Sequence, residues 1–313
     1  MDLKQLQYFV CVVDAHSFSR AAGMLKLAQP TLSRQIALLE KDLGYRLLAR
    51  TGRGVVPSEA GRALLAHARR MLESARLARE ELSELQESPR GRVAVGLPPR
   101  LALGLSATLV AQLRESMPRV VISIFEGQSP QLREWLLEGK LDVALLFDPA
   151  PSTQLDYEQL LRETLLLVAP MHGSALPERA SLPFLTRFPM VLPAAPNAIR
   201  SLIDALLRPQ RIELNVIAEV GAVQTVLSLV ARGIGCTILP EGALNLGANQ
   251  FKLRTSLIGP PTVYTNIVLA SPRSGHASRA VQETMRMLRA VDYAALRLPS
   301  AFEEGAPGPA SSV

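Results

Sequence analysis

The chain is poor in the residues that carry enzyme chemistry or hold secreted proteins together. Only two of its 313 residues are cysteine and only four are histidine. Cys11 and Cys236 each lie in an apolar run with no second Cys or His at metal-binding spacing, which predicts buried free thiols in a reducing compartment. The histidines fall in separate segments with no partner at ligand or triad spacing, and we expect surface positions for His16, His67, His172 and His276.

Motifs for cofactors and catalysis are missing as well. The sequence has no Walker loop, nucleophile elbow or zinc motif. Gly233-Ile234-Gly235 is a fragment of a dinucleotide fingerprint, but it follows a predicted helix instead of a strand. A helix C-cap and turn explains it better. We therefore predict a protein that is not an enzyme and that needs no cofactor and no metal.

Long hydrophobic runs are absent too. No apolar segment reaches the roughly 20 residues that span a bilayer, and the first residues lack the core of a signal peptide. These absences predict a cytoplasmic protein with no membrane partner. The 48% hydrophobic content is enough for a core, and the length allows about two domains of roughly 100–200 residues each.

The charge is unevenly distributed. The net charge is +6, and residues 1–58 alone hold eight Lys and Arg against four Asp and Glu. Most of the excess positive charge therefore lies in less than a fifth of the chain. A basic segment of this kind suits a polyanionic partner without proving one.

Residues 17–43 have the pattern of two short helices separated by a tight break. A preceding helix is predicted over residues 3–15, and Ser17 is a predicted N-cap for the next one. The chain breaks at residues 27–28, and Pro30 then begins a third helix that stops at Gly44. The buried stripe of this third helix comprises Leu32, Ile36, Leu39 and Leu43. This arrangement is typical of a helix-turn-helix that reads the DNA major groove.

The polar residues of the third helix gather at its N-terminal, outward end. Gln, Thr, Ser and Arg side chains there can hydrogen-bond base edges and phosphates. The predicted reading end comprises Gln29, Thr31, Ser33, Arg34 and Gln35.

A hairpin wing is predicted directly after these helices. Residues 51–54 form a turn signal between two short apolar runs. Arg50 and Arg53 would project from this hairpin, and a narrow minor groove attracts arginines. The alternative is that both arginines are solvated surface charges.

A long helix follows the wing, with Ser58 as its predicted N-cap. Residues 59–87 contain no Pro and, apart from Gly61, no Gly. Small and apolar residues recur at alternating spacings of four and three, which is a heptad seam typical of helix pairing between two chains. The predicted dimerisation seam comprises Leu64, Ala68, Met71, Ala75, Ala78, Leu82 and Leu85. The alternative is an amphipathic helix that packs on its own domain.

From residue 92 the pattern changes to alternating strands and helices, which predicts a parallel sheet with right-handed crossovers. Ligands of such sheets bind at the carboxyl ends of strands, near helix N-termini. Four strand–helix loops qualify, and each of them is equally explained as an ordinary connection: residues 97–100, 128–129, 193–197 and 221–225.

The segments SFSRAAGMLKLAQPTLSRQIALLEKDLGYRLLAR and RGVVPSEAG resemble the N-terminal domain of LysR-type transcriptional regulators. The resemblance extends over about residues 1–295 and includes LLEGKLDVALL and LVARGIGCTILPE. It implies an α/β protein with an all-α winged helix-turn-helix, a dimerising linker helix and a two-lobed α/β domain like periplasmic solute-binding proteins. It further implies homodimers that pair as homotetramers, promoter-proximal DNA, a small-molecule effector and, as a possible partner, RNA polymerase.

The resemblance also implies boundaries and site residues. The DNA-binding domain would span residues 1–58, the linker helix 59–90, the regulatory domain 91–298 and a disordered tail 299–313. The first lobe would comprise about 91–163 and 267–298 and the second about 164–266, with crossovers near 162–168 and 263–270. Carried over, the major-groove residues are Gln29, Pro30, Thr31, Ser33 and Arg34, with Arg53 on the wing. The effector residues are Leu97, Pro98, Pro99, Arg100, Gln128, Ser129, Asn197, Val223, Gln224 and Thr225.

One departure concerns the effector site. Many members have Ser or Thr directly after the first strand of the regulatory domain, whereas this chain has Pro98-Pro99. This weakens the prediction of an anionic effector: Arg100 would have to supply the charge, or the ligand is less polar. The segments VGLPPRLALGLS and LPAAPNAIRSLID resemble the nitrogen-assimilation-control branch of the family.

Two other classes of function compete with a regulator. A solute-binding module with a vestigial DNA domain is disfavoured by the polar helix end and the wing arginines. An enzyme is disfavoured by the scattered histidines.

Overall fold

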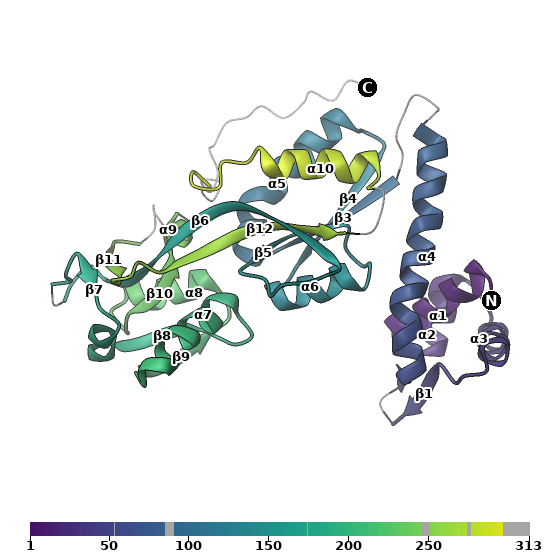
Figure 1. The fold of residues 1–313 in the computed structure, drawn as a ribbon, viewed down its shortest axis with the longest axis horizontal. Coiled ribbons are helices and arrows are strands. Elements are labelled where there is room, and N and C mark those ends of the chain that lie inside the picture. The colour runs from purple at the N-terminus through teal and green to yellow at the C-terminus, as the bar shows by residue number, and fades with distance from the viewer. Residues whose placement is uncertain (53, 85–90, 174, 246–250, 274–276, 297–313) are drawn as a thin grey trace, which may run out of the picture.

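The computed structural model describes residues 1–52, 54–84, 91–173, 175–245, 251–273 and 277–296. Figure 1 shows a helical N-terminal unit beside the long helix α4 and, on the other side of α4, a larger part built from two lobes. The predicted disordered tail, 299–313, and His276 lie outside the described residues. None of the described helices is long and apolar enough to cross a membrane.

The N-terminal unit has the predicted helices and wing: α1 (Leu3–Ala15), α2 (Phe18–Leu25), α3 (Gln29–Leu43), β1 (Leu48–Thr51) and β2 (Gly54–Pro57). Ser17 caps α2 by accepting a hydrogen bond from the Arg20 amide, and α3 ends at Gly44 in a left-handed conformation (φ 75°). Pro30 is the second residue of α3 instead of the first. The core joins the apolar faces of α1 and α3, chiefly Leu6, Phe9, Val12, Leu32, Ile36 and Leu39.

Helix α4 (Glu59–Glu84) begins where the wing ends. The Ser58 hydroxyl accepts a hydrogen bond from the Gly61 amide at 3.0 Å, which confirms the predicted N-cap. Position 61 lies so close to the carbonyl oxygen of Leu47 that a Cβ there would overlap it. The glycine therefore lets the first turn of α4 approach the wing.

The first lobe is a sheet flanked by helices: β3 (Gly91–Leu97), α5 (Pro99–Ser116), β4 (Val120–Glu126), α6 (Ser129–Leu137), β5 (Val143–Phe147) and α10 (Arg279–Arg289). Strand β3 pairs in parallel with β4 and with β5. The next strands in the sheet, β12 (Tyr264–Pro272) and β6 (Leu155–Pro170), pair antiparallel. The prediction of a wholly parallel sheet was therefore wrong, and the sheet is mixed.

Strands β6 and β12 run side by side from one lobe to the other (Figure 1). Strand β6 pairs with β12 as far as Thr164, and from Leu165 onward it pairs with two strands of the second lobe. This change of partner on β6 falls within residues 162–168, where the first of the two crossovers was predicted.

The second lobe carries its own apolar core around Leu167, Met190 and Ile203. Its elements are β7 (Arg179–Ala180), η1 (Pro183–Arg187), β8 (Pro189–Pro193), α7 (Ala198–Leu207), η2 (Arg208–Gln210), β9 (Asn215–Val220), α8 (Val223–Ala231), β10 (Thr237–Pro240), α9 (Glu241–Leu244) and β11 (Leu253–Ile258). Strand β11 was not predicted from the sequence, and α7 was implied only as the helix after the loop 193–197, without bounds.

The two thiols differ in their surroundings. Cys236 is buried as predicted, and burial raises the pKa of its thiol to about 11. Cys11 is only half-buried, which corrects the prediction, and burial together with the charge of Asp14 raises its thiol pKa. Thiols with raised pKa values are poor nucleophiles at neutral pH. His16, His67 and His172 are exposed, in agreement with the prediction.

We predict that Gly61→Ala destabilises the N-terminal unit. The added methyl group must displace the Leu47 carbonyl, at a cost of about 1–3 kcal/mol that exceeds the gain of about 1 kcal/mol from helix propensity. Gly23→Ala is the control, because a Cβ on this glycine of α2 meets nothing within 4 Å and should be neutral or stabilising. The urea concentration at the unfolding midpoint of each variant measures this effect. An unchanged midpoint for Gly61→Ala would contradict the close approach of α4 to Leu47.

Candidate DNA-binding surface and interlobe pocket

The N-terminal end of α3 presents the predicted polar residues to solvent. Leu32, Ile36 and Leu39 are fully buried beneath it. Gln29, Pro30, Thr31 and Arg34 are exposed, whereas Ser33 and Gln35 are half-buried. The residue before the helix, Ala28, has no side chain that could cap the first amides. Pro30 has no amide hydrogen, and the Thr31 amide donates to the Ala28 carbonyl at 3.0 Å. The side chains are therefore the main donors and acceptors that this end offers to DNA, together with the Gln29 amide.

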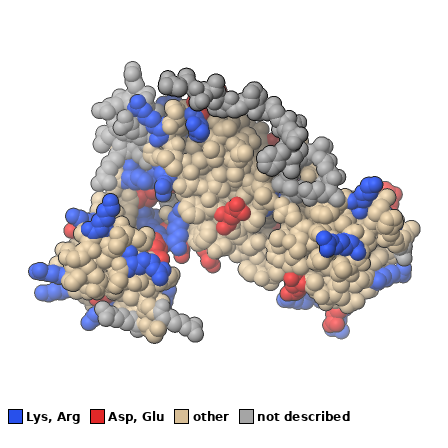
Figure 2. Space-filling view, turned by 180° about the vertical axis from the view of Figure 1, so that it is seen from behind, with Lys and Arg blue, Asp and Glu red and all other residues tan. Residues whose placement is uncertain are grey.

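Lys and Arg side chains surround the N-terminal unit (lower left in Figure 2). The predicted wing is present as an antiparallel hairpin in which Thr51 pairs with Gly54. The Val55 amide donates to the His16 carbonyl at 3.0 Å and fixes the wing against the end of α1. Arg50 lies in β1, and its side chain is not described; Arg53 lies outside the described residues.

The predicted dimerisation seam on α4 faces two different surroundings. Ala68 is fully buried in the core of its own N-terminal unit, and Leu64 and Met71 pack partly against the same core. Ala68 therefore has no surface to offer a second chain, and its assignment to the seam is corrected. Ala75 is half-buried and Ala78 is exposed. Leu82 lies in α4 without a described side chain, and Leu85 lies outside the described residues.

Between the lobes lies a pocket of about 90 Å³ at the N-terminal ends of α5, α6, α7 and α8. All four loops proposed from the sequence contribute to its wall. The predicted residues that line it are Pro98, Pro99, Arg100, Gln128, Ser129, Asn197, Val223 and Gln224. Leu97 belongs to the core of the first lobe and does not line the pocket, nor does Thr225, and both predictions are corrected.

Sequence reasoning missed the apolar part of the wall. Phe147 at the end of β5, Leu239 and Pro240 at the end of β10 and Ala243 of α9 line the pocket. Phe147 and Pro240 end strands of different lobes, so the rule that ligands bind at strand ends could have found them. Leu103, Pro193, Ala198, Ile199, Gly221 and Ala222 complete the wall.

Arg100 forms a buried ion pair at the edge of this pocket. Its Nη1 and Nη2 atoms donate to Oε1 and Oε2 of Glu163 at 3.1 and 2.5 Å. Only 8% and 4% of the two side chains are exposed. The guanidinium also lies over the Phe147 ring, 4.9 Å from its centroid. Glu163 comes from β6, so the pair connects α5 to the strand that crosses between the lobes.

A hydrogen bond also joins the lobes directly across the pocket. The Asn197 amide nitrogen donates to Oε1 of Gln128 at 3.2 Å. Asn197 also caps α7, because its side-chain oxygen accepts from the Ile199 amide at 2.9 Å. The bond therefore connects the start of α6 in the first lobe with the start of α7 in the second.

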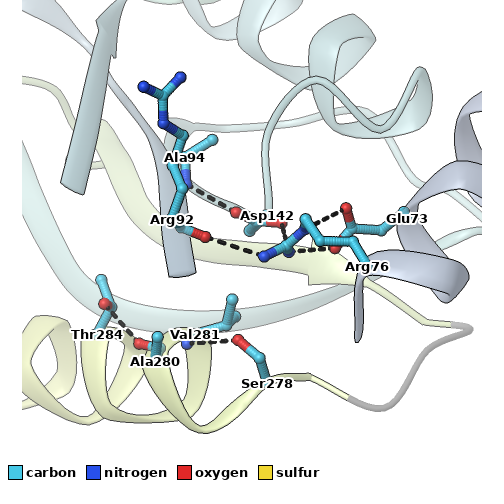
Figure 3. Close-up of polar contacts among 9 residues, drawn as sticks. All are labelled: Glu73, Arg76, Arg92, Ala94, Asp142, Ser278, Ala280, Val281 and Thr284. Atoms are coloured by element: carbon cyan, nitrogen blue, oxygen red, sulfur yellow. Dashed lines mark hydrogen bonds and ion pairs between the residues drawn. The ribbon is translucent and has the colours of Figure 1, made fainter. Parts of the chain in front are cut away.

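A group of ion pairs joins α4 to the first lobe. Arg69, with 5% of its side chain exposed, binds Asp14 of α1 and donates to Glu138, which follows α6, at 2.8 Å. About two turns further along α4, Arg76 binds Glu73, approaches Asp142 at 3.4 Å and donates to the Arg92 carbonyl at 3.1 Å (Figure 3). Asp142 in turn accepts from the Ala94 amide at 2.7 Å. We call this group the linker junction.

Comparison with known families identifies two segments. The profile described as "Bacterial regulatory helix-turn-helix protein, lysR family" matches residues 3–62, and that described as "LysR substrate binding domain" matches residues 86–292.

Individual relatives agree with these matches. The nitrogen assimilation regulatory protein nac of Klebsiella aerogenes is 32% identical over 92% of this chain and 94% of its own length. That of Escherichia coli K12 is 31% identical over 93% and 95%. Both fit the predicted nitrogen-assimilation-control branch.

Solved structures support the fold. A full-length OxyR variant from Pseudomonas aeruginosa superposes with a TM-score of 0.76 at 21% identity and covers 98% of this chain and 99% of its own. Full-length CbnR in complex with its target DNA superposes with a TM-score of 0.58 at 22% identity and covers 92% of this chain and 99% of its own.

We predict that Arg69→Met weakens the linker junction. It leaves Asp14 and Glu138 without their shared cation, and because both carboxylates are more than a third exposed the loss should be about 1–2 kcal/mol, below that of a fully buried pair. Arg70→Met, one residue along and exposed, is the control. Chemical unfolding at pH 7 gives the free energy of unfolding of both variants. Equal values would show that the ion pairs of Arg69 do not stabilise the protein.

The stability lost in Arg69→Met should depend on pH. Burial raises the pKa of the Glu138 carboxyl, but hydrogen bonds and charges from Lys140 and Arg69 outweigh it and hold the pKa below its usual 4.5. A lowered folded-state pKa contributes stability above pH 4.5 that is lost as the pH falls below it. The stability difference between the wild type and Arg69→Met should therefore shrink over that acid range.

Proposed function

The chain belongs to the LysR family of transcriptional regulators and is a DNA-binding regulator with an effector-binding domain, and we propose which of its residues contact DNA, a second chain and the effector. We propose that the exposed polar end of α3 is the part that contacts DNA. It presents side chains that can hydrogen-bond base edges and phosphates. Gln29, Pro30, Thr31, Ser33 and Arg34 would lie in the major groove, and Arg50 and Arg53 of the wing at the minor groove.

We propose that two copies pair through the C-terminal half of α4, beyond the part that packs on its own unit. Ala75, Ala78, Leu82 and Leu85 would form this contact, with Leu64 and Met71 at its edge. Two α3 helices would then read half-sites one or more helical turns apart, each turn being about 34 Å. Pairing of two such dimers would give the homotetramer, placed beside a promoter where RNA polymerase becomes a further partner.

The interlobe pocket is the proposed effector site, formed by Pro98, Pro99, Arg100, Gln128, Ser129, Asn197, Val223 and Gln224. A ligand that prefers one arrangement of the lobes shifts the population toward it, and only this difference in affinity can act on DNA binding. The linker junction supplies the connection, because it ties the first lobe to α4 and to α1 of the DNA-binding unit. Residues 1–58, 59–90 and 91–298 remain the proposed functional divisions.

We predict that Arg34→Ala weakens DNA binding. If Arg34 touches a phosphate, the slope of log K against log salt should fall in magnitude by about 0.9, because one fewer counterion is released. Arg114→Ala, an exposed arginine on α5 of the first lobe, is the control and should leave the slope unchanged. Fluorescence anisotropy over a salt series measures this; equal slopes for all three proteins would place Arg34 away from the phosphates.

We predict that Ala78→Glu splits the dimer, because it buries an unpaired charge in the helix seam. Ala78→Ser keeps a small side chain at the same exposed position and should leave the assembly intact. Light scattering at matched concentrations gives the masses. An undiminished mass for Ala78→Glu would show that this face of α4 does not pair with a second chain.

A further inference from the structure

We propose that the interlobe pocket takes a small uncharged molecule with an apolar body and one hydrogen-bond acceptor, and that Glu163 sets this preference by neutralising Arg100. The inference rests on the proposed function of the pocket as the effector site. It names the chemical class of the ligand and the residue that selects it.

The charges of the pocket cancel. Arg100 is the one charged residue among the described residues that line it, and both of its terminal nitrogens are engaged by Glu163. A carboxylate ligand beside Arg100 would also meet the Glu163 carboxylate. Removing an anion from water is costly unless a cation compensates it, and here the cation already has a partner.

The guanidinium is enclosed on its remaining sides. Phe147 covers one face at 4.9 Å from the ring centroid to Arg100 Cζ. Gly242 of the second lobe packs so close to the ion pair that a Cβ at this position would overlap Glu163 Oε1 and lie 2.7 Å from Arg100 Nη1. Arg100 is therefore held by both lobes and cannot swing freely toward a ligand.

The donors that remain available are neutral. Ser129 is 5% exposed, and its Oγ accepts a hydrogen bond from the Phe147 amide at 2.8 Å, which leaves the hydroxyl proton for an acceptor. Helix α8 begins at Val223 without a side-chain cap, so its first amides are further donors at the wall. Pro98, Pro99, Phe147 and Leu239 provide the apolar surface.

The volume limits the size of the ligand. At about 90 Å³ the pocket is smaller than the ~150 Å³ cavity that holds benzene, so about four or five non-hydrogen atoms fit without opening the lobes. Propionamide and propionate have this size and nearly the same shape, and they differ in charge. This pair therefore tests the charge preference by itself.

The experiment is a ligand-detected NMR titration of the full-length protein with each probe. The wild type should bind propionamide at least tenfold more tightly than propionate. Glu163→Gln removes the neutralising charge and should reverse the preference by at least tenfold. Glu158→Gln is the matched control, because this residue lies on the same strand but pairs with Arg289 at the surface, and it should behave like the wild type.

Two further measurements keep the result interpretable. Leu103→Trp, at a half-exposed position of the pocket wall, should abolish binding of both probes if they occupy this pocket. Circular dichroism reports whether Glu163→Gln folds, and if it does not, the preference of the wild type alone decides the charge class. Tighter binding of propionate to the wild type would overturn the inference and leave the pocket as a ligand site. Binding of neither probe to any variant would remove the proposed function of the pocket together with the inference.

Discussion

The ion pairs of Arg69 hold the DNA-binding unit, α4 and the first lobe in one arrangement. A single buried guanidinium binds a carboxylate of the DNA-binding unit and one of the first lobe, while its own backbone belongs to α4. Both carboxylates remain partly exposed, so the cost of desolvation is modest and the pair stays favourable. Farther along, Arg76 adds a second contact between α4 and the first lobe. Helix α4 is therefore a rod of about 39 Å whose first half is part of the DNA-binding core and whose side is fixed to the first lobe.

The two lobes are joined in a different way. Strands β6 and β12 pass between them, and the pocket lies where the loops of both lobes meet. The Gln128–Asn197 hydrogen bond and the Arg100–Glu163 pair cross or border this gap. A molecule that alters these contacts would change the balance between lobe arrangements, and under the proposed function the linker junction would carry that change from the first lobe to α4.

The sequence predicted most where structure is determined locally. The proline near its start, the apolar stripe and the turn glycine of α3 lie within 20 residues, and the helix was predicted to within one residue. The extent of α7 was not predicted, although Asn197 caps it and Ile199, Ile203 and Leu207 lie at helical spacing. The antiparallel pairing of β6 with β12 was missed because these strands are about 100 residues apart and buried runs do not reveal strand direction. In the same way, neither Glu163, which pairs with Arg100 beside the pocket, nor Arg69 in the junction has a partner nearby in sequence.

Footprinting of genomic fragments recovered with the purified protein tests whether α4 sets two α3 helices at a fixed separation for sequence-specific DNA binding. We expect discrete fragments, each with two protected half-sites whose spacing is the same from fragment to fragment and equals a whole number of helical turns. Uniform, salt-sensitive binding without preferred fragments, or protected segments at varying separations, would contradict it.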